Sequence, residues 1–204
     1  YDQAFNTINN IIKNLDNSSD SFLSFKDILD HVEVDPSAYT SKIKLQLNPE
    51  MPAREAAKEL MKFLLKVMQQ NIEGIKDNID VEYLHDFRVA IRRTRSALSQ
   101  LKGVFPEDST QKFKTDFAYL GKLSNRMRDL DVYLLKKEEY QKLVPPNLHP
   151  GLEVLFSNLA RERKTEHKKL VRNLTSQKVL TILREWESFL YSEDPQPDSI
   201  NGEV

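Results

Sequence analysis

Residues 83–105 read YLHDFRVAIRRTRSALSQLKGVF, and the side chains suited to a protein core recur there with the period of an α-helix. At about 100° per residue, these side chains share roughly a third of the helix circumference. They are Leu84, Phe87, Ile91, Thr94, Leu98 and Leu101. The pattern therefore predicts a helix that buries one face in a hydrophobic core, and the rest of the chain is organised around it.

The same helix carries a row of basic side chains beside its apolar stripe. The row consists of His85, Arg88, Arg92 and Arg95. Its members fall within an arc of about 80°, from which Arg93 points away, and neighbours along it are close enough for like charges to repel. Few acids lie nearby, so the row favours an anionic ligand. The alternative is that these side chains cover the edge of the core or pair with acids of another helix.

The composition limits the possible classes of protein. The chain has 204 residues, of which 39% are hydrophobic and 30% charged, as in a soluble helical protein with one large or two small domains. The net charge of −1 gives no general attraction to nucleic acid or membrane, so an anion site must come from local clustering.

Cysteine is absent, which excludes disulfides and thiolate ligands and fits a cytosolic protein. No apolar run approaches the roughly 20 residues that span a bilayer. No signal peptide opens the chain, and because it begins at Tyr1 we expect a fragment of a longer protein.

A second helix is expected before residues 83–105. It should begin near Pro52 and run for about 25 residues, because proline suits the first turn of a helix. Asn78 and Asp80 then predict a turn that leads into the central helix.

Two further helical patterns follow the central helix. A third helix is expected over residues 109–143, with Ser109 as its N-cap. Its core seam consists of Phe113, Phe117, Leu120, Leu123, Met127, Leu130 and Leu134. A fourth helix is expected over residues 152–174 and, after a stop near Thr175, over residues 179–191.

Four long helices joined by short polar or proline-containing breaks predict an all-α protein built as an antiparallel four-helix bundle. Short amphipathic helices are expected before it, over residues 1–16 and 22–34. The expected domains are residues 1–51, with the short N-terminal helices and a linker that resembles the end of a preceding domain, and residues 52–192, with the bundle. Residues 193–204 are expected to be a flexible tail or linker.

The third predicted helix adds a second group of charged residues. Lys122, Arg126 and Arg128 are followed by two carboxylates, Asp129 and Asp131. Paired acids can serve acid–base chemistry, but beside arginines they normally stay ionised. We therefore expect both acids to be structural salt-bridge partners that orient guanidinium groups, for which the arginines of the central helix are candidates.

The fourth predicted helix presents a second basic stripe. Lys164, His167 and Lys168 share one face at three- and four-residue spacing. Taken alone this is a common solvated face, but beside the row of the central helix it would complete a strong polyanion site. Neither stripe has the paired histidines or the cysteines of a zinc site, so no metal is expected.

Two of these stretches resemble a known family. HDFRVAIRRTRSAL at 85–98, with Phe105 after it, and RDLDVYL at 128–134 are similar in order and spacing to the signature of the conserved histidine α-helical domain, CHAD. The resemblance covers roughly residues 52–192. It implies an all-helical fold of two four-helix bundles in tandem, with basic residues along a central groove. Only one bundle is found in this chain, and a second half would have to come from elsewhere.

The resemblance also implies a binding module for inorganic polyphosphate, often placed after a CYTH domain. Carried over by position, the implied phosphate-binding residues are His85, Arg88, Arg92, Arg93, Arg95, Lys122, Arg126, Arg128, Lys164, His167 and Lys168. The implied location is the cytoplasm, at polyphosphate granules.

We therefore expect a non-enzymatic polyanion-binding module without cofactor or metal. No Walker loop or carboxylate cluster suited to Mg²⁺ is found, which argues against an enzyme. The stripe lacks aromatic residues for base stacking, which argues against specific nucleic acid recognition. No membrane partner is expected. The expected partners are a second copy of the chain, through self-association, or a neighbouring CYTH-type domain. The alternatives are a helical scaffold or protein-interaction domain, whose basic stripe pairs with acids of itself or of a partner, and an accessory domain of a phosphohydrolase or kinase.

Overall fold

The computed structural model describes residues 41, 43 and 45–192, all within a unit of the chain that begins at Ser41. This described part contains α-helices, one 3-10 helix and no strand, so the prediction of an all-α protein is confirmed. None of the described helices is long and apolar enough to cross a membrane. The short helices predicted over residues 1–16 and 22–34 lie outside the described residues, as does the predicted tail. The predicted domain boundaries stay predictions.

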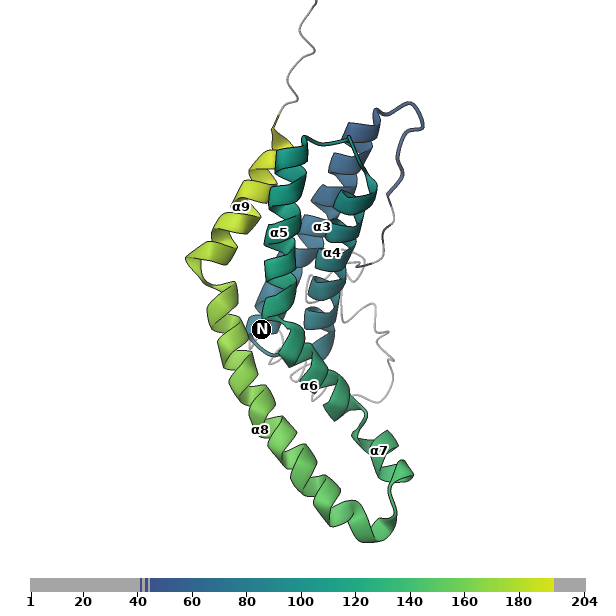
Figure 1. Ribbon diagram of the computed structural model, residues 1–204, viewed down its shortest axis with the longest axis vertical. Coiled ribbons are helices and arrows are strands. Elements are labelled where there is room, and N and C mark those ends of the chain that lie inside the picture. Colours follow the sequence, from purple (N-terminus) through teal and green to yellow (C-terminus); the bar gives the residue numbers. More distant parts are fainter. Residues whose placement is uncertain (1–40, 42, 44, 193–204) are drawn as a thin grey trace, which may run out of the picture. The chain divides into compact units, whose positions relative to one another are not determined.

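Figure 1 shows the order of the elements. They are α3 (Ala53–Lys76), α4 (Val81–Gln100), α5 (Glu107–Leu123), α6 (Asn125–Leu135), α7 (Lys137–Leu143), the 3-10 helix η1 (Pro146–Leu148), α8 (His149–Leu174) and α9 (Gln177–Tyr191). Successive helices α3, α4 and α5 run antiparallel and are joined by short connections.

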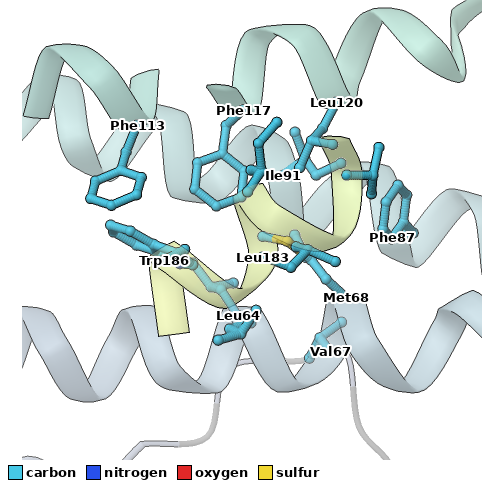
Figure 2. Close-up of a cluster of buried hydrophobic side chains, with 14 of the residues drawn as sticks. Leu64, Val67, Met68, Phe87, Ile91, Phe113, Phe117, Leu120, Leu183 and Trp186 are labelled. Carbon is cyan, nitrogen blue, oxygen red and sulfur yellow. The ribbon is translucent and has the colours of Figure 1, made fainter. Parts of the chain in front are cut away.

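Helices α3, α4, α5 and α9 pack around a common hydrophobic core, and Figure 2 shows side chains of all four meeting there. Trp186 of α9 is fully buried, and its ring centroid lies 4.6 Å from that of Phe113 and 5.3 Å from that of Phe117 on α5. The stripe predicted for the central helix faces this core. Its members Leu84, Phe87, Ile91, Thr94 and Leu98 are buried, and Leu101 packs against them.

The prediction of one continuous third helix over residues 109–143 is wrong. The stretch is divided into α5, α6 and α7, with breaks at Ser124 and Lys136. Ser109 is not the N-cap, because α5 begins directly after Pro106. The fixed φ of proline suits the start of a helix, and the two acidic residues in the first turn of α5 complement the helix dipole.

The fourth predicted helix is divided where expected, although its two segments begin earlier than predicted. α8 begins at His149 rather than at residue 152, because Pro150 occupies its first turn instead of marking a break. The stop at Thr175 is confirmed. α9 begins after Ser176, whose side chain accepts a hydrogen bond from the backbone amide of Val179 at 3.4 Å.

Helices α6 and α8 pack along each other and extend past one end of the four-helix core (Figure 1). Met127 at the start of α6 belongs to that core, as do Leu170 and Leu174 at the end of α8. The second half of the predicted third helix and the first half of the predicted fourth therefore form a two-helix arm, and only α5 and α9 complete the bundle.

The turn between α3 and α4 has the predicted chemistry. Asn78 adopts a left-handed conformation with φ of 52°, and Asp80 caps α4 by accepting from the amide of Glu82 at 2.8 Å. Just before this turn, the buried Gly74 of α3 lies against the ring of Tyr83 on α4. A Cβ atom on residue 74 would overlap that ring, so glycine allows α3 and α4 to approach closely.

We expect Gly74→Ala to destabilise the bundle although alanine favours helices. The added methyl group must displace the Tyr83 ring, and overpacking of this kind typically costs about 1–3 kcal/mol. The matched control is Gly151→Ala in the first turn of α8, where nothing lies within 4 Å of the new Cβ atom, so this substitution should cause no destabilisation. Urea denaturation followed by circular dichroism measures both changes. Equal effects of the two substitutions would contradict the close approach of α3 and α4.

Candidate anion-binding site

A cavity of about 470 Å³ lies between α4 and α5, near the junction of α5 with α6. It is lined by His85, Arg88, Val89, Ile91, Arg92 and Arg95 of α4, by Ala118, Gly121 and Lys122 of α5, and by Asn125 and Arg128 of α6. The complete basic row of the central helix therefore faces one cavity.

Small side chains on α5 create the hollow. Ala118 and Gly121 line it, and a Cβ atom on Gly121 would have Ile91 as its nearest neighbour, at 3.8 Å. Short side chains thus leave space between the two helices, while long basic side chains stand around it. The apolar stripe of α4 holds this arrangement in place from the opposite side, because it is buried in the core.

Among the described residues, six side chains that line this first cavity are basic and none is acidic. They are His85, Arg88, Arg92, Arg95, Lys122 and Arg128. Within the described residues, the salt bridges involve other basic side chains and none of these six. The cluster has no carboxylate in direct contact to offset its mutual repulsion, so an anion would bind favourably there.

Arg88 ties the cavity to the junction between α5 and α6. Its Nη1 donates to the backbone oxygen of Gly121 at 3.2 Å, to Oγ of Ser124 at 2.8 Å and to Oδ1 of Asn125 at 2.9 Å. A cation at this position complements the carbonyl end of α5. Within the described residues, Nε and Nη2 of Arg88 make no hydrogen bond, so they remain available to a ligand.

The electrostatics of Arg88 and Arg128 also favour an anion. Burial lowers the pKa of Arg88, Asp129 opposes this shift, and the positive charges of Arg128 and Arg92 add to it. Nη1 of Arg128 is buried and has no hydrogen-bond partner among the described residues. A buried donor without a partner costs about 1–3 kcal/mol. An anionic oxygen in the cavity would offset both penalties.

A second cavity of about 570 Å³ adjoins the first and shares Arg92, Arg95 and Ala118 with it. Its other lining residues are Ser96, Ser99 and Gln100 of α4 and Gln111, Lys114 and Thr115 of α5. These positions lie toward the end of α4 and the start of α5. The two cavities together are called the α4–α5 groove below.

Two of the predicted binding residues on or near the central helix lie outside this groove. Nη1 of Arg93 donates to the backbone oxygen of Ser41 at 2.8 Å. Arg126 forms a salt bridge across to α8, with its Nη2 at 2.6 Å from Oε1 of Glu162. Both side chains are exposed, and neither lines either cavity.

The predicted basic stripe of α8 also lies outside the groove. Nε2 of His167 donates to the backbone oxygen of Ile75 at 2.7 Å and so helps to cap the end of α3. Lys164 and Lys168 are exposed, and neither lines either cavity of the groove. The structure therefore brings Lys122 and Arg128 to the row of the central helix, but not these three residues of α8.

The two predicted salt-bridge acids have different surroundings. Asp131 is 1% exposed, and its Oδ1 accepts from Nε of Arg163 on α8 at 2.6 Å. Arg163 also donates through Nη1 to Oδ1 of Asn78 at 2.9 Å, which links α6 and α8 to the turn after α3. Asp129 is exposed and acts on Arg88 electrostatically from outside the cavity lining.

Sequence reasoning did not include Lys114 or Asn125 among the binding residues. A usable signal exists for Lys114, because Lys114, Ala118 and Lys122 recur every four residues and therefore share one face of α5. No such signal exists for Asn125, which follows a helix break that the sequence pattern does not indicate. The described residues contain no group of three or more side chains suited to holding a metal ion.

Comparison with models of known protein families identifies the family of this chain. The family model described as the CHAD domain matches residues 59–203, which is more than half of the chain. A search of curated proteins finds no match. Domains of the matched family are generally non-catalytic helical modules and are associated with polyphosphate binding and metabolism.

The buried carboxyl of Asp131 should shape how stability depends on pH. Burial raises its pKa, and the hydrogen bond and charge of Arg163 oppose that rise without cancelling it. A carboxyl whose pKa is higher in the folded state binds more protons there, so its stabilising contribution is present at low pH. The contribution is lost as pH rises from the unfolded value of about 3.9 through the folded value. We therefore expect the free energy of unfolding of the wild type to fall, relative to that of Asp131→Asn, across this window.

Urea denaturation from about pH 3.5 to about pH 7 measures this difference. Asp129→Asn is the matched control, since it places an amide on the exposed side of the same helix. If the free energy of unfolding of wild type minus that of Asp131→Asn is independent of pH, or rises with pH, the pKa of Asp131 is not raised in the folded protein.

Proposed function

Because the chain belongs to the CHAD family, we propose that it is a non-catalytic module that binds inorganic polyphosphate in the α4–α5 groove. The observation that carries the proposal is the lining of the first cavity, to which the described residues contribute six basic side chains and no acidic one. Its unsatisfied donor on Arg128 and the free nitrogens of Arg88 are groups that phosphate oxygens would satisfy.

The chemistry and length of the groove suit a linear chain of phosphates. Guanidinium groups bind phosphate oxygens through charge-assisted and often bidentate hydrogen bonds. Residues that line the groove extend along α4 from His85 to Gln100, a rise of about 22 Å. A ligand with negative charge at regular intervals would contact several basic side chains at once, whereas a single phosphate would contact few.

Other partners fit this groove less well. No Phe, Tyr or Trp in the described part of the chain lines either cavity, so single-stranded nucleic acid would lack stacking platforms there. The scaffold alternative requires the basic row to pair with acids, and the six basic side chains form no salt bridge within the described residues. Failure of polyphosphate to bind in the test below would instead favour the scaffold alternative with an acidic partner protein.

The proposed ligand also suggests where the module acts. Any hydrolysis of polyphosphate would belong to a neighbouring domain, for which the CYTH type is the candidate. The protein would be found in the cytoplasm, at the granules in which polyphosphate accumulates.

The double substitution Arg92→Gln with Arg95→Gln should weaken binding of long-chain polyphosphate by at least about 2 kcal/mol, which is roughly 30-fold, because two charge-assisted contacts are lost. Both side chains are exposed and line both cavities, so the helical fold should persist. The affinity of the wild type should fall steeply with salt, and the salt dependence should be shallower in the variant because fewer counterions are released. Isothermal titration calorimetry at low and moderate salt measures both effects.

The matched control is Arg161→Gln with Arg172→Gln, which removes the same charge from exposed positions of α8 outside the groove. It should reduce the affinity by no more than about threefold, the effect of long-range electrostatics alone. Single-stranded DNA should not displace the ligand. Equal losses in the two double variants would show that polyphosphate binds through general charge and not in the groove.

A further inference from the structure

The two cavities of the groove differ in chemistry. The first cavity is lined by six basic side chains and by Asn125 as its one neutral polar side chain. The second is lined by three basic side chains, of which Arg92 and Arg95 are shared with the first, and by five neutral polar ones. Those five are Ser96, Ser99, Gln100, Gln111 and Thr115. Hydroxyl and amide groups thus gather at one end of an otherwise cationic groove.

Two hydroxyl groups of the second cavity donate hydrogen bonds to backbone oxygens. Oγ of Ser99 donates to the backbone oxygen of Arg95 at 2.9 Å, and Oγ1 of Thr115 donates to the backbone oxygen of Gln111 at 3.0 Å. A hydroxyl group has one hydrogen and two lone pairs. While these hydrogen bonds are in place, both oxygens offer a ligand only lone pairs and so act as hydrogen-bond acceptors.

The glutamines of the second cavity add acceptors and donors together. Within the described residues, the side-chain amides of Gln100 and Gln111 make no hydrogen bond, so their oxygen and nitrogen atoms are both available. An unbranched phosphate chain at neutral pH offers oxygen acceptors almost alone. It can bind Lys114 and the arginines, but it cannot donate to Ser99, Thr115 or the glutamine oxygens.

We infer that the second cavity binds the hydroxyl-bearing part of a phosphate ester, a sugar-like polyol whose attached phosphates lie against Arg92 and Arg95 and extend into the first cavity. This inference rests on the proposed function, because it uses the same groove for the phosphates. Ligand hydroxyl groups donate to the acceptors on Ser99 and Thr115 and accept from the glutamine amides. Because none of the described residues that line the second cavity is Phe, Tyr or Trp, we assign this contact to hydroxyl groups rather than to a stacked base. The groove therefore binds phosphorylated polyols more tightly than plain phosphate chains of equal charge.

A series of nucleoside triphosphates tests this inference, because its members differ only in their hydroxyl groups. Isothermal titration calorimetry would compare ATP, 2′-deoxy-ATP and 2′,3′-dideoxy-ATP, with inorganic tripolyphosphate as the plain chain, at low salt and without divalent metal ions. We expect the affinity to fall by about threefold to tenfold for each hydroxyl group removed, the size of one net hydrogen bond.

The double variant Ser99→Ala with Thr115→Val should abolish that dependence, so that ATP, 2′-deoxy-ATP and 2′,3′-dideoxy-ATP bind with affinities within about twofold of one another. Thr110→Val is the matched control. Oγ1 of Thr110 donates to the backbone oxygen of Pro106 at 3.0 Å on the same helix, but Thr110 lines neither cavity, and the dependence should persist.

The outcomes separate this inference from the proposed function. Equal affinities of ATP and dideoxy-ATP, or an ATP preference that survives the Ser99 and Thr115 substitutions, would overturn the inference and leave polyphosphate binding intact. Failure of ATP to bind where long-chain polyphosphate binds would overturn it as well. If neither tripolyphosphate nor long-chain polyphosphate binds, the proposed function fails with it.

Discussion

The hydrogen bonds of Arg88 to the α5–α6 junction are the contact on which the site depends. Arg88 stands beside the buried stripe of α4, so its position is set by the core. Its Nη1 reaches the last turn of α5 and the first residue of α6, where Gly121, Ser124 and Asn125 supply three acceptors. One side chain therefore joins three helices and at the same time lines the first cavity. A ligand that binds the remaining nitrogens of Arg88 would meet a rigid donor.

The near-neutral composition of the chain does not weaken this local field, because acids and bases are sorted in space. Outside the groove, carboxylates pair with basic side chains, as in Lys112 with Glu185, Arg126 with Glu162 and Lys137 with Glu153. Inside the first cavity no carboxylate lines the wall. The first cavity is therefore a concentrated positive patch in a chain whose net charge is only −1. This separation of charges provides local anion affinity without the non-specific anion binding of a strongly basic protein.

Much of the bundle could be predicted from side-chain periodicity. The buried stripe of α4, from Leu84 to Leu98, follows from a period of 3.6 residues, and the turn at Asn78 and Asp80 follows from local backbone chemistry. The break at Ser124 could not be predicted in this way. The seam from Leu120 through Met127 continues across it without proline or glycine at the break, and the acceptors exposed there are satisfied by Arg88 from another helix.

The site was predictable to the extent that its residues share one helix. The row from His85 to Arg95 lies on one face of α4 by spacing alone, and the structure places all of it in the groove. A helical wheel does not give the rotation of one helix relative to another, so it could not show that His167 of α8 would face Ile75. For the same reason Asp131 meets Arg163 of α8 and not the arginines of α4. The hydroxyl-lined end of the groove could not be predicted from the sequence, because serine and glutamine in a helix form no distinctive pattern.

A titration followed by NMR of the arginine side-chain Nε–Hε groups tests most directly whether polyphosphate lies in the α4–α5 groove. Long-chain polyphosphate should shift the signals of Arg88, Arg92, Arg95 and Arg128 together, because these four side chains line the first cavity. The signals of Arg161 and Arg172, which lie on α8 outside the groove, should move little. Shifts confined to the arginines of α8, with the four groove arginines unchanged, would show that polyphosphate binds to α8 and not in the groove.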